Sequence, residues 1–273
     1  MKKVYVSRHA GRPLMEFLVQ QGYEINTVTE YGIINQQTTD IDRTLGLVRN
    51  EDGTLSSTRS LHVDRRIASH ADIYMCQLGL WNEAGIFVGD PDKLTSKYPG
   101  DIIYNAVCTR DYFFHLIEKT DPELMDSFVS WRRSLRPESR PGSSDSPHDD
   151  TKVIGIRQGY ARCMCLPVDN ESFITSDEGI YRPLEAQGAK VLLIQPGHIK
   201  LDGFPHGFIG GTAGNIYINS GGMTDQRAIV FNGDLSVHPD FKKITSFIKS
   251  RNILPVWFES YALEDIGSIL SVE

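Results

Sequence analysis

Hydrophobic and polar positions follow a strand–helix–strand order three times along this chain. The copies lie at residues 3–26, 171–194 and 228–257. In each copy an apolar run is followed by apolar residues at helical spacing and then by a second apolar run. Turn and capping residues separate the runs, such as Pro13 before the first helix and Gly188 after the second. Spacing of roughly 50–60 residues between the second and third copies indicates that one supersecondary unit is repeated.

Short apolar runs between these copies predict further strands. They lie at 72–78, 102–105, 208–210 and 216–218. Two polar stretches without an apolar period, at 35–60 and 134–150, are expected to be surface loops. Repeated units of strands and helices predict one α/β domain over residues 1–273.

Composition is that of a globular protein. Hydrophobic residues make up 40% of the chain and charged residues 23%, and no run approaches the ~20 apolar residues that cross a bilayer. The apolar run near the start, residues 4–6, is shorter than the ~7–15 residues of a signal-peptide core. We therefore expect a soluble protein without membrane contact or an export signal.

Charge and cysteine usage exclude further classes. A net charge of −7 argues against nucleic-acid binding, because neutralising a phosphate backbone takes clustered Lys and Arg. The basic cluster between Arg132 and Arg140 is interpreted as part of a solvated loop. All four cysteines fall in apolar stretches, which is typical of buried thiols in a reducing compartment. The expected location is cytoplasmic.

Cys163 and Cys165 permit three interpretations. On a strand, spacing of two would put both thiols on one face, where they could bind a metal with His9, His62 or His70. A single Cys-x-Cys pair is a weak signal, and buried structural thiols are the commoner case. Either thiol could also be a relocated nucleophile, although the neighbouring sequence supplies no obvious base. We predict no metal and no cofactor.

Several motifs in the second half of the chain occur in one order. A strand ends in the turn Ser176–Gly179, a helix and a strand follow, and Pro196–Gly203 then carries a His-hydrophobic-Lys sequence. This order resembles the penteins, the superfamily of guanidine-modifying enzymes that includes dimethylarginine dimethylaminohydrolase, arginine deiminase and the amidinotransferases. The resemblance implies a pentein-type α/β propeller of repeated ββαβ units with pseudo-fivefold symmetry. It best suits an uncharacterised bacterial family of that fold.

Further segments support the resemblance. Gly100–Tyr104 and Arg110–Phe114 are similar to two strands of those enzymes, the first of which carries an aspartate that contacts the guanidino group. Residues 208–219 are similar to the glycine-bounded strands beside the catalytic histidine. Residues 265–271 are similar to the last core strand.

The expected nucleophile is missing from that last strand. Active penteins carry a cysteine there, whereas here the position falls on Ser268, Ile269 or Leu270, and no cysteine follows Cys165. Attack on a guanidinium carbon needs a nucleophile that ionises near neutral pH, which a serine without a dedicated base does not do. Ordinary arginine deiminase or dimethylarginine hydrolase activity is therefore expected to be absent.

The resemblance nevertheless assigns candidate site residues. His198 would act as general acid or base, and Ser268 would occupy the nucleophile position. The residues that would contact the substrate are Asp101, Asn105, Lys200 and Asp202. The plain alternative is that His198 and Asp101 are ordinary turn residues after Pro-Gly.

Two functions stay open at this level, both with a small polar ligand, such as a guanidino compound. A diverged hydrolase or transferase of guanidino or related C–N compounds should bring His198, a carboxylate and a hydroxyl or thiol to one channel mouth. A non-catalytic pentein, acting as a binder or assembly factor, can leave that mouth filled by Ile269 and Leu270. The oligomeric state does not follow from the sequence.

Overall fold

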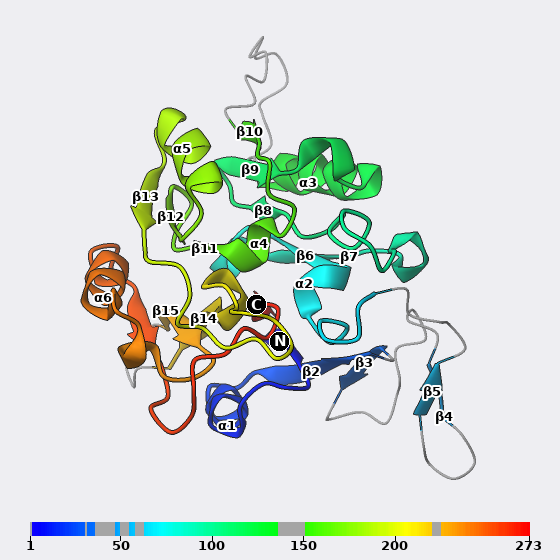
Figure 1. Cartoon of the computed structure of the whole chain (residues 1–273), viewed down its shortest axis with the longest axis horizontal. Helices are drawn as coiled ribbons and strands as arrows, with labels where there is room; N and C mark the ends of the chain where they lie inside the picture. The colour runs from blue at the N-terminus through cyan, green and yellow to red at the C-terminus, as the bar shows by residue number, and fades with distance from the viewer. Residues whose placement is uncertain are drawn as a thin grey trace.

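A computed structural model describes residues 2–30, 63–135, 151–219 and 225–273, together with the backbone of short strands at 32–35, 47–49 and 55–57. The expected loops at 35–60 and 134–150 lie mostly outside these residues. Within them the chain is a mixed α/β protein with several small sheets and the helices α1–α6. Figure 1 shows the longer helices at the periphery and the single-turn helices α2 (Ala71–Tyr74) and α4 (Ala161–Met164) nearer the middle.

Four groups of elements share one topology, in which an antiparallel strand pair is followed by a helix and by a third strand parallel to the second. The first group comprises β17 (Leu270–Val272), β1 (Lys3–Ser7), α1 (Arg12–Gln20) and β2 (Glu24–Thr29). The second comprises β8 (Val107–Cys108), β9 (Tyr112–His115), α3 (Pro122–Ser134) and β10 (Lys152–Gly155). The third comprises β11 (Cys165–Pro167), β12 (Ser172–Thr175), α5 (Glu178–Ala186) and β13 (Lys190–Leu193). The fourth comprises β14 (Ala213–Ile218), β15 (Gln226–Phe231), α6 (Phe241–Lys249) and β16 (Leu254–Val256).

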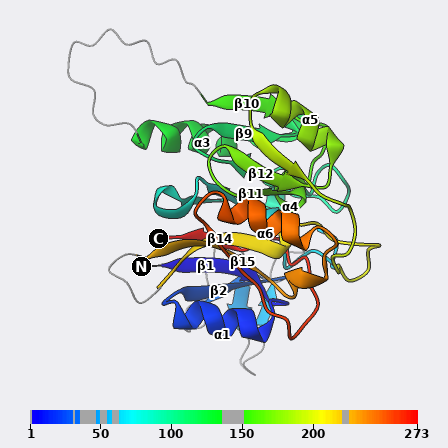
Figure 2. The same cartoon turned by 90° about the vertical axis from the view of Figure 1, so that its left-hand side faces the viewer.

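The other elements are shorter. The hairpin of β6 (Met75–Leu78) and β7 (Gly85–Val88) extends the β8 sheet, because β6 runs parallel to β8. β3 (Gly32–Asn35) pairs with β2, and β4 (Leu47–Arg49) pairs with β5 (Leu55–Ser57). Single 3₁₀ turns are η2 (Trp81–Glu83), η3 (Pro91–Lys93), η4 (Ile117–Lys119), η5 (Gly210–Thr212) and η6 (Leu235–Val237). In Figure 2 the two ends of the chain lie side by side, where β17 pairs with β1.

All three predicted strand–helix–strand copies are confirmed, as β1-α1-β2, β12-α5-β13 and β15-α6-β16. Their boundaries follow from local chemistry. Proline stands in the first turn of α1, where its missing N–H leaves no hydrogen bond unmade. Gly188, with φ of 84°, follows α5 in the left-handed conformation that glycine adopts without strain.

Replacing Asp177 by alanine tests the local control of α5. The Asp177 carboxylate accepts a hydrogen bond from the backbone N–H of Ile180 at 2.9 Å and so caps the helix. Loss of such a cap is expected to lower the free energy of unfolding by about 1 kcal/mol, measured by urea denaturation. Substitution of Glu178, whose side chain pairs only on the surface with Arg182, should cost less.

Several predicted strands are wrong in one consistent way. In the predicted strand 72–78, the first residues form α2 and only Met75–Leu78 form a strand. Residues 102–105 are a turn, Gly210 opens η5, and the last strand begins only at Leu270. Apolar runs this short do not distinguish a strand from a helical turn by periodicity alone. Each of these turns precedes a strand and carries a residue of the site described below.

Two other expectations need correction. Cys163 lies in α4 and Cys165 opens β11, so the two thiols do not share one face of a strand. Arg132 and Arg133 belong to the last turn of α3 and not to a loop. The capping residue of α3, Asp121, accepts from the backbone N–H groups of Glu123 and Leu124, a start signal that the hydrophobic pattern alone did not reveal.

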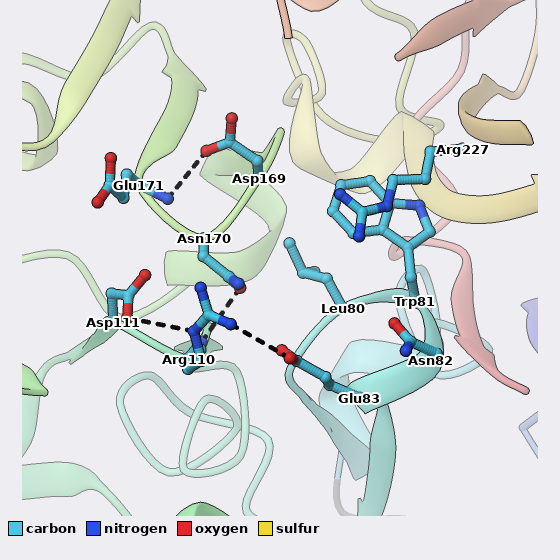
Figure 3. A pocket seen from close by; sticks show the side chains of 10 residues that line it. All are labelled: Leu80, Trp81, Asn82, Glu83, Arg110, Asp111, Asp169, Asn170, Glu171 and Arg227. Atoms are coloured by element: carbon cyan, nitrogen blue, oxygen red, sulfur yellow. Dashed lines mark hydrogen bonds and ion pairs between the residues drawn. The ribbon is translucent and has the colours of Figure 1, made fainter. Parts of the chain in front are cut away.

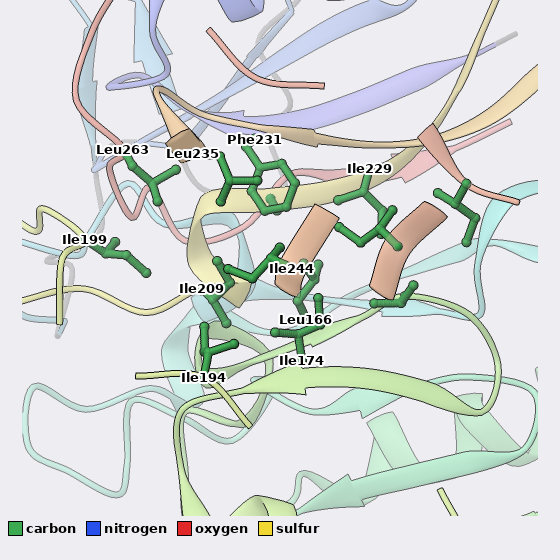
Figure 4. Packing of buried hydrophobic residues seen from close by; sticks show 14 of the residues in the cluster. Leu166, Ile174, Ile194, Ile199, Ile209, Ile229, Phe231, Leu235, Ile244 and Leu263 are labelled. Atoms are coloured by element: carbon green, nitrogen blue, oxygen red, sulfur yellow. The ribbon is translucent and has the colours of Figure 1, made fainter. Parts of the chain in front are cut away.

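Buried clusters lie between neighbouring groups of elements. One joins β11 and β12 to β15 and α6, through residues that include Leu166, Ile174, Ile229 and Ile244 (Figure 4). Others join β1 to β14 and β15, β9 to β12, β6 to β8, and β2 to β6. Each group therefore packs against two others. None of the helices in the described ranges has both the length and the apolar character needed to cross a membrane.

Candidate functional site

Five segments meet where the structure departs from the predicted strands. In each segment one hydrogen-bonding residue lies within three residues of the start of a strand. We call these five residues the five-segment ring. The ring residues and the strands they precede are Asp72 before β6, Asn105 before β8, Arg162 before β11, Gly210 before β14 and Ser268 before β17. All five are buried.

Hydrogen bonds join the five-segment ring in sequence order and close it. The Asn105 amide donates to the Asp72 carbonyl at 3.0 Å, and its oxygen accepts from the Arg162 backbone N–H at 2.8 Å. The Arg162 guanidinium donates to the Gly210 carbonyl at 2.9 Å. The Ser268 hydroxyl lies 3.2 Å from that carbonyl and donates to Asp72 Oδ2 at 2.5 Å. A Cβ on Gly210 would lie 2.1 Å from the Arg162 carbonyl, so only glycine fits there.

Two residues of this ring carry buried charged groups. Arg162 and Asp72 are both buried, and the guanidinium also donates to the Ala213 carbonyl at 3.0 Å. Burial lowers the pKa of Arg162 while the Asp72 carboxylate raises it. A guanidinium stays charged across the physiological range. The two groups therefore compensate each other in the interior.

Cys163 connects the five-segment ring to a cavity. Its thiol donates to Asp72 Oδ2 at 3.0 Å and lines a hollow of about 250 Å³, which we call the Cys163 cavity. The polar residues that line it are Cys163, His70, His206, Asp265 and Tyr160. The apolar residues are Ile67, Leu201, Phe204, Pro205 and Phe208. An apolar wall with a few convergent polar groups is the usual construction of a small-molecule site.

Burial sets the protonation of these groups. It raises the pKa of the Cys163 thiol well above its ordinary value, and the charges of Asp72 and Asp265 act in the same direction. It lowers the pKa of His70 to about 4, against the opposing effect of Asp72. At neutral pH the cavity therefore presents a neutral thiol and a neutral imidazole.

Asp265 titrates near neutrality. Burial, partly offset by the hydrogen bond from the backbone N–H of Gly267, raises its pKa to about 7. The backbone N–H of Phe208 also donates to the carboxylate, at 2.9 Å. The bond from Phe208 ties the segment before β14 to the segment before β17. The carboxyl group can take either charge state at physiological pH, so it can adapt to the charge of a ligand.

Two predicted residues, Asn105 and Ser268, belong to the ring. Ser268 is fully buried, has φ of 69°, and does not line the Cys163 cavity. The Asn105 amide contacts Cys163 Sγ at 3.5 Å. Both residues thus lie beside the Cys163 cavity, and the group that lines it is the Cys163 thiol.

Asp101 supports the cavity from behind. Its Oδ2 accepts from the Tyr160 hydroxyl at 2.6 Å, and Tyr160 lines the cavity. Burial and this hydrogen bond raise the pKa of Tyr160, which stays a neutral phenol. Asp101 thus positions a lining residue.

Asp202 and Lys200 lie at the edge of the site. Asp202 lines an adjoining hollow of about 230 Å³ that shares His70 and Asp265 with the Cys163 cavity. Lys200 forms ion pairs with Asp202 at 3.1 Å and with Glu264 at 3.2 Å, which raise the pKa of the lysine. Both side chains are exposed, so they contribute to the rim.

His198 lies elsewhere. It is exposed, has φ of 64°, and its ring packs edge-on against His238 with centroids 5.9 Å apart. No interaction within the described part of the chain joins His198 to Asp101, Asp202 or Ser268. The histidines that line the Cys163 cavity are His70 and His206. A catalytic role for His198 stays a prediction without geometric support.

Sequence reasoning missed three residues of the site, namely Asp72, Tyr160 and Asp265, and named His70 only as one of three possible metal partners of Cys163 and Cys165. Asp72 had a detectable signal, because a carboxylate at the start of an otherwise apolar run is costly to bury without a function or a partner. Nothing in the sequence distinguished His70 from His9 and His62, because its place is set by tertiary packing. A Cβ on Gly267 would lie 2.1 Å from the His70 Cβ, which shows how closely the segment before β17 approaches it.

A second pocket, of about 270 Å³, lies at the other ends of β6, β8 and β11. Figure 3 shows Arg110 between Glu83 and Asp111, and Arg227 over the ring of Trp81. Trp81 has φ of 53°, and its buried indole N–H has no partner among the described residues. Arg110 forms ion pairs with both Glu83 and Asp111.

No curated protein and no solved structure matches this chain. A family model does match, over residues 80–135 and 144–270, which together include most of the five-segment ring and Cys163. The matched stretches cover more than half of the 273 residues. On this match the chain belongs to DUF6873, a family of unknown function.

Proposed function

We propose that this chain is a pentein-type α/β propeller with pseudo-fivefold symmetry that binds a small cationic molecule, of the guanidino or amidino class, in the Cys163 cavity. The observation that carries the fold is the closed five-segment ring. Five strands begin at five hydrogen-bonded residues, which succeed one another around the ring in sequence order.

Topology and packing support the same arrangement. Four groups have the ββαβ order that the resemblance implies, and the β6–β7 hairpin takes the fifth place. The buried clusters connect each group to the next and the last to the first, as sheets around an axis would be. A crystal structure with one open, doubly wound parallel sheet would contradict the proposal.

The ligand class follows from the chemistry of the cavity. Its polar groups are the Asp265 carboxyl, the Cys163 thiol, two histidines and the Tyr160 hydroxyl, and the described residues that line it include no lysine or arginine. A cation there would favour the ionised form of Asp265, whereas an anion would be repelled by that form. The aromatic and aliphatic wall suits a ligand with an apolar portion.

Binding of the cation should strengthen as the pH rises through about 7, because Asp265 ionises in that range. Isothermal titration with arginine, dimethylarginine, agmatine and benzamidine is the measurement. Asp265→Asn is expected to lower the affinity for the tightest-binding of these compounds at least about tenfold and to abolish the pH dependence of that affinity.

Asp111→Asn provides the matched control. Asp111 is a carboxylate in the second pocket, so its loss should leave the affinity unchanged. If no cationic compound binds, or if both variants weaken binding equally, the assignment of the ligand to the Cys163 cavity is wrong.

A second candidate function is a diverged hydrolase or transferase of C–N compounds, and the observation in its favour is the thiol in the cavity. Cys165 is fully buried and does not line the cavity, and neither does Ser268, so Cys163 is the candidate nucleophile there. In this step Sγ would bond to the guanidinium carbon while a C–N bond breaks, and the thiol proton would leave with the departing amine. Water would then hydrolyse the S–C bond and restore the thiol.

The two candidates separate in a turnover assay on the compounds that bind. A hydrolase releases an amine and a urea or ureido product, and Cys163→Ser stops that release while Ser268→Ala retains it. Binding without any turnover favours the non-catalytic candidate. Turnover that survives Cys163→Ser would show that the nucleophile lies elsewhere.

A further inference from the structure

Three side chains with different metal-binding atoms converge at the inner end of the Cys163 cavity. They are His70, Asp72 and Cys163, and all three are buried. An imidazole nitrogen, a carboxylate oxygen and the thiol sulfur all lie within 4.8 Å of one another. The segments that carry them are α2, with the residue that precedes it, and α4.

One polar group of this cluster is unsatisfied. Asp72 Oδ1 is buried and has no hydrogen-bond partner among the described residues, although Oδ2 accepts from both Ser268 and Cys163. Buried polar groups are satisfied in the great majority of native structures, and an unpaired one needs an explanation such as a bound ion.

We propose that His70, Asp72 and Cys163 form a binding site for one divalent transition-metal ion of the zinc class. The inference does not depend on the proposed fold or on the cationic ligand, because it uses only these three side chains. The metal would accept a lone pair from the His70 imidazole and from an Asp72 oxygen. It would replace the thiol proton of Cys163, which is released to solvent.

The geometry fits a tetrahedral ion after small side-chain adjustments. Bonds of ~2.0–2.3 Å to nitrogen, oxygen and sulfur place ligand atoms ~3.3–3.8 Å apart on a tetrahedron. Cys163 Sγ and Asp72 Oδ2 are already 3.0 Å apart. A mixed set of nitrogen, oxygen and sulfur favours zinc or cobalt over magnesium or calcium, which prefer oxygen alone.

The fourth position would face the cavity. His70 and Cys163 line the Cys163 cavity, whereas Asp72 is fully buried behind them. Three protein ligands with one position open to a cavity is the arrangement of catalytic zinc sites, and closed structural sites use four. A metal here would thus be accessible to water or to a small ligand.

Cobalt binding to the metal-free full-length chain tests the proposal. Co²⁺ added to EDTA-treated, dialysed protein should bind at one ion per chain. It should produce a thiolate-to-cobalt charge-transfer band in the near ultraviolet and the visible bands of tetrahedral cobalt. Zn²⁺ should displace the cobalt and bleach both.

The variants assign the ligands. Cys163→Ser keeps the size of the side chain and should abolish the charge-transfer band, with cobalt affinity falling at least about 100-fold, since loss of an outer-shell partner alone costs up to ~100-fold. His70→Gln should weaken binding similarly. The matched controls are Cys165→Ala and His206→Asn, because Cys165 is a buried thiol outside the cluster and His206 lines the same cavity without belonging to it.

Circular dichroism of each variant without metal checks that it folds. The proposal is overturned if wild-type protein gives no charge-transfer band, or if Cys163→Ser retains it. It is also overturned if the control variants lose it to the same degree while staying folded. None of these outcomes depends on whether guanidino compounds bind, so this test and that of the proposed function fail independently.

Discussion

Replacing Arg162 by alanine should destabilise the protein by about 3–5 kcal/mol, the largest effect that we expect from one substitution. Arg162 is 5% exposed, and its guanidinium donates to the carbonyls of Gly210 and Ala213. The Ala213 carbonyl keeps a second donor, the backbone N–H of Ile269, whereas the Ser268 hydroxyl near the Gly210 carbonyl gives its proton to Asp72. The larger cost is electrostatic, because Asp72 is left as a buried charge without its compensating cation.

Urea denaturation of wild type and variant measures this effect. Arg157→Ala is the control, since Arg157 is an exposed arginine a few residues earlier, and its loss should change the free energy of unfolding by less than about 0.5 kcal/mol. A cost of under about 1 kcal/mol for Arg162→Ala would mean that the ring does not depend on this charge pair.

Asp265 should make the stability of the protein depend on pH. Its pKa is about 7 in the folded protein against an ordinary value of 3.8. Below pH 3.8 the carboxyl is protonated in both states and has no effect. As the pH rises from there, the unfolded chain ionises while the folded protein stays protonated, so stability is lost progressively until about pH 7. The gap between the two pKa values corresponds to ~4 kcal/mol.

Comparison with Asp265→Asn isolates this contribution. The asparagine is neutral in both states, so the altered hydrogen bonding to Phe208 and Gly267 adds only a constant offset. The free energy of unfolding of wild type minus that of the variant should fall between pH 4 and pH 7. It should be flat above that range. A difference that does not change with pH would show that Asp265 is ionised in the folded state throughout.

The two predictions concern the five-segment ring and the Cys163 cavity beside it. Arg162 acts within the five-segment ring, which holds the starts of five strands together. Asp265 acts at the cavity, where it ties the segments before β14 and β17 to each other. A ligand or a metal in the Cys163 cavity would therefore contact residues that also hold the fold together. Ligand binding should accordingly raise the melting temperature of the protein.

The sequence by itself determined the repeated units. Apolar periodicity and caps such as Asp177 and Gly188 located β1-α1-β2, β12-α5-β13 and β15-α6-β16, because helix starts and stops are governed by residues within a few positions of each other. Comparison of motifs also directed attention to Asn105 and Ser268, which the structure places in the five-segment ring. These features depend on neighbours along the chain.

Only the tertiary structure decided which groups share the site. His70, Asp72 and Cys163 are separated by up to 93 positions, yet they converge on one cluster. The same packing placed His198 at the surface beside His238. Periodicity within a short apolar run cannot show that Asp72 lies in a helical turn, since the turn forms to meet partners on three other segments. The chemistry of this site is thus set by contacts between strand starts, which local sequence does not encode.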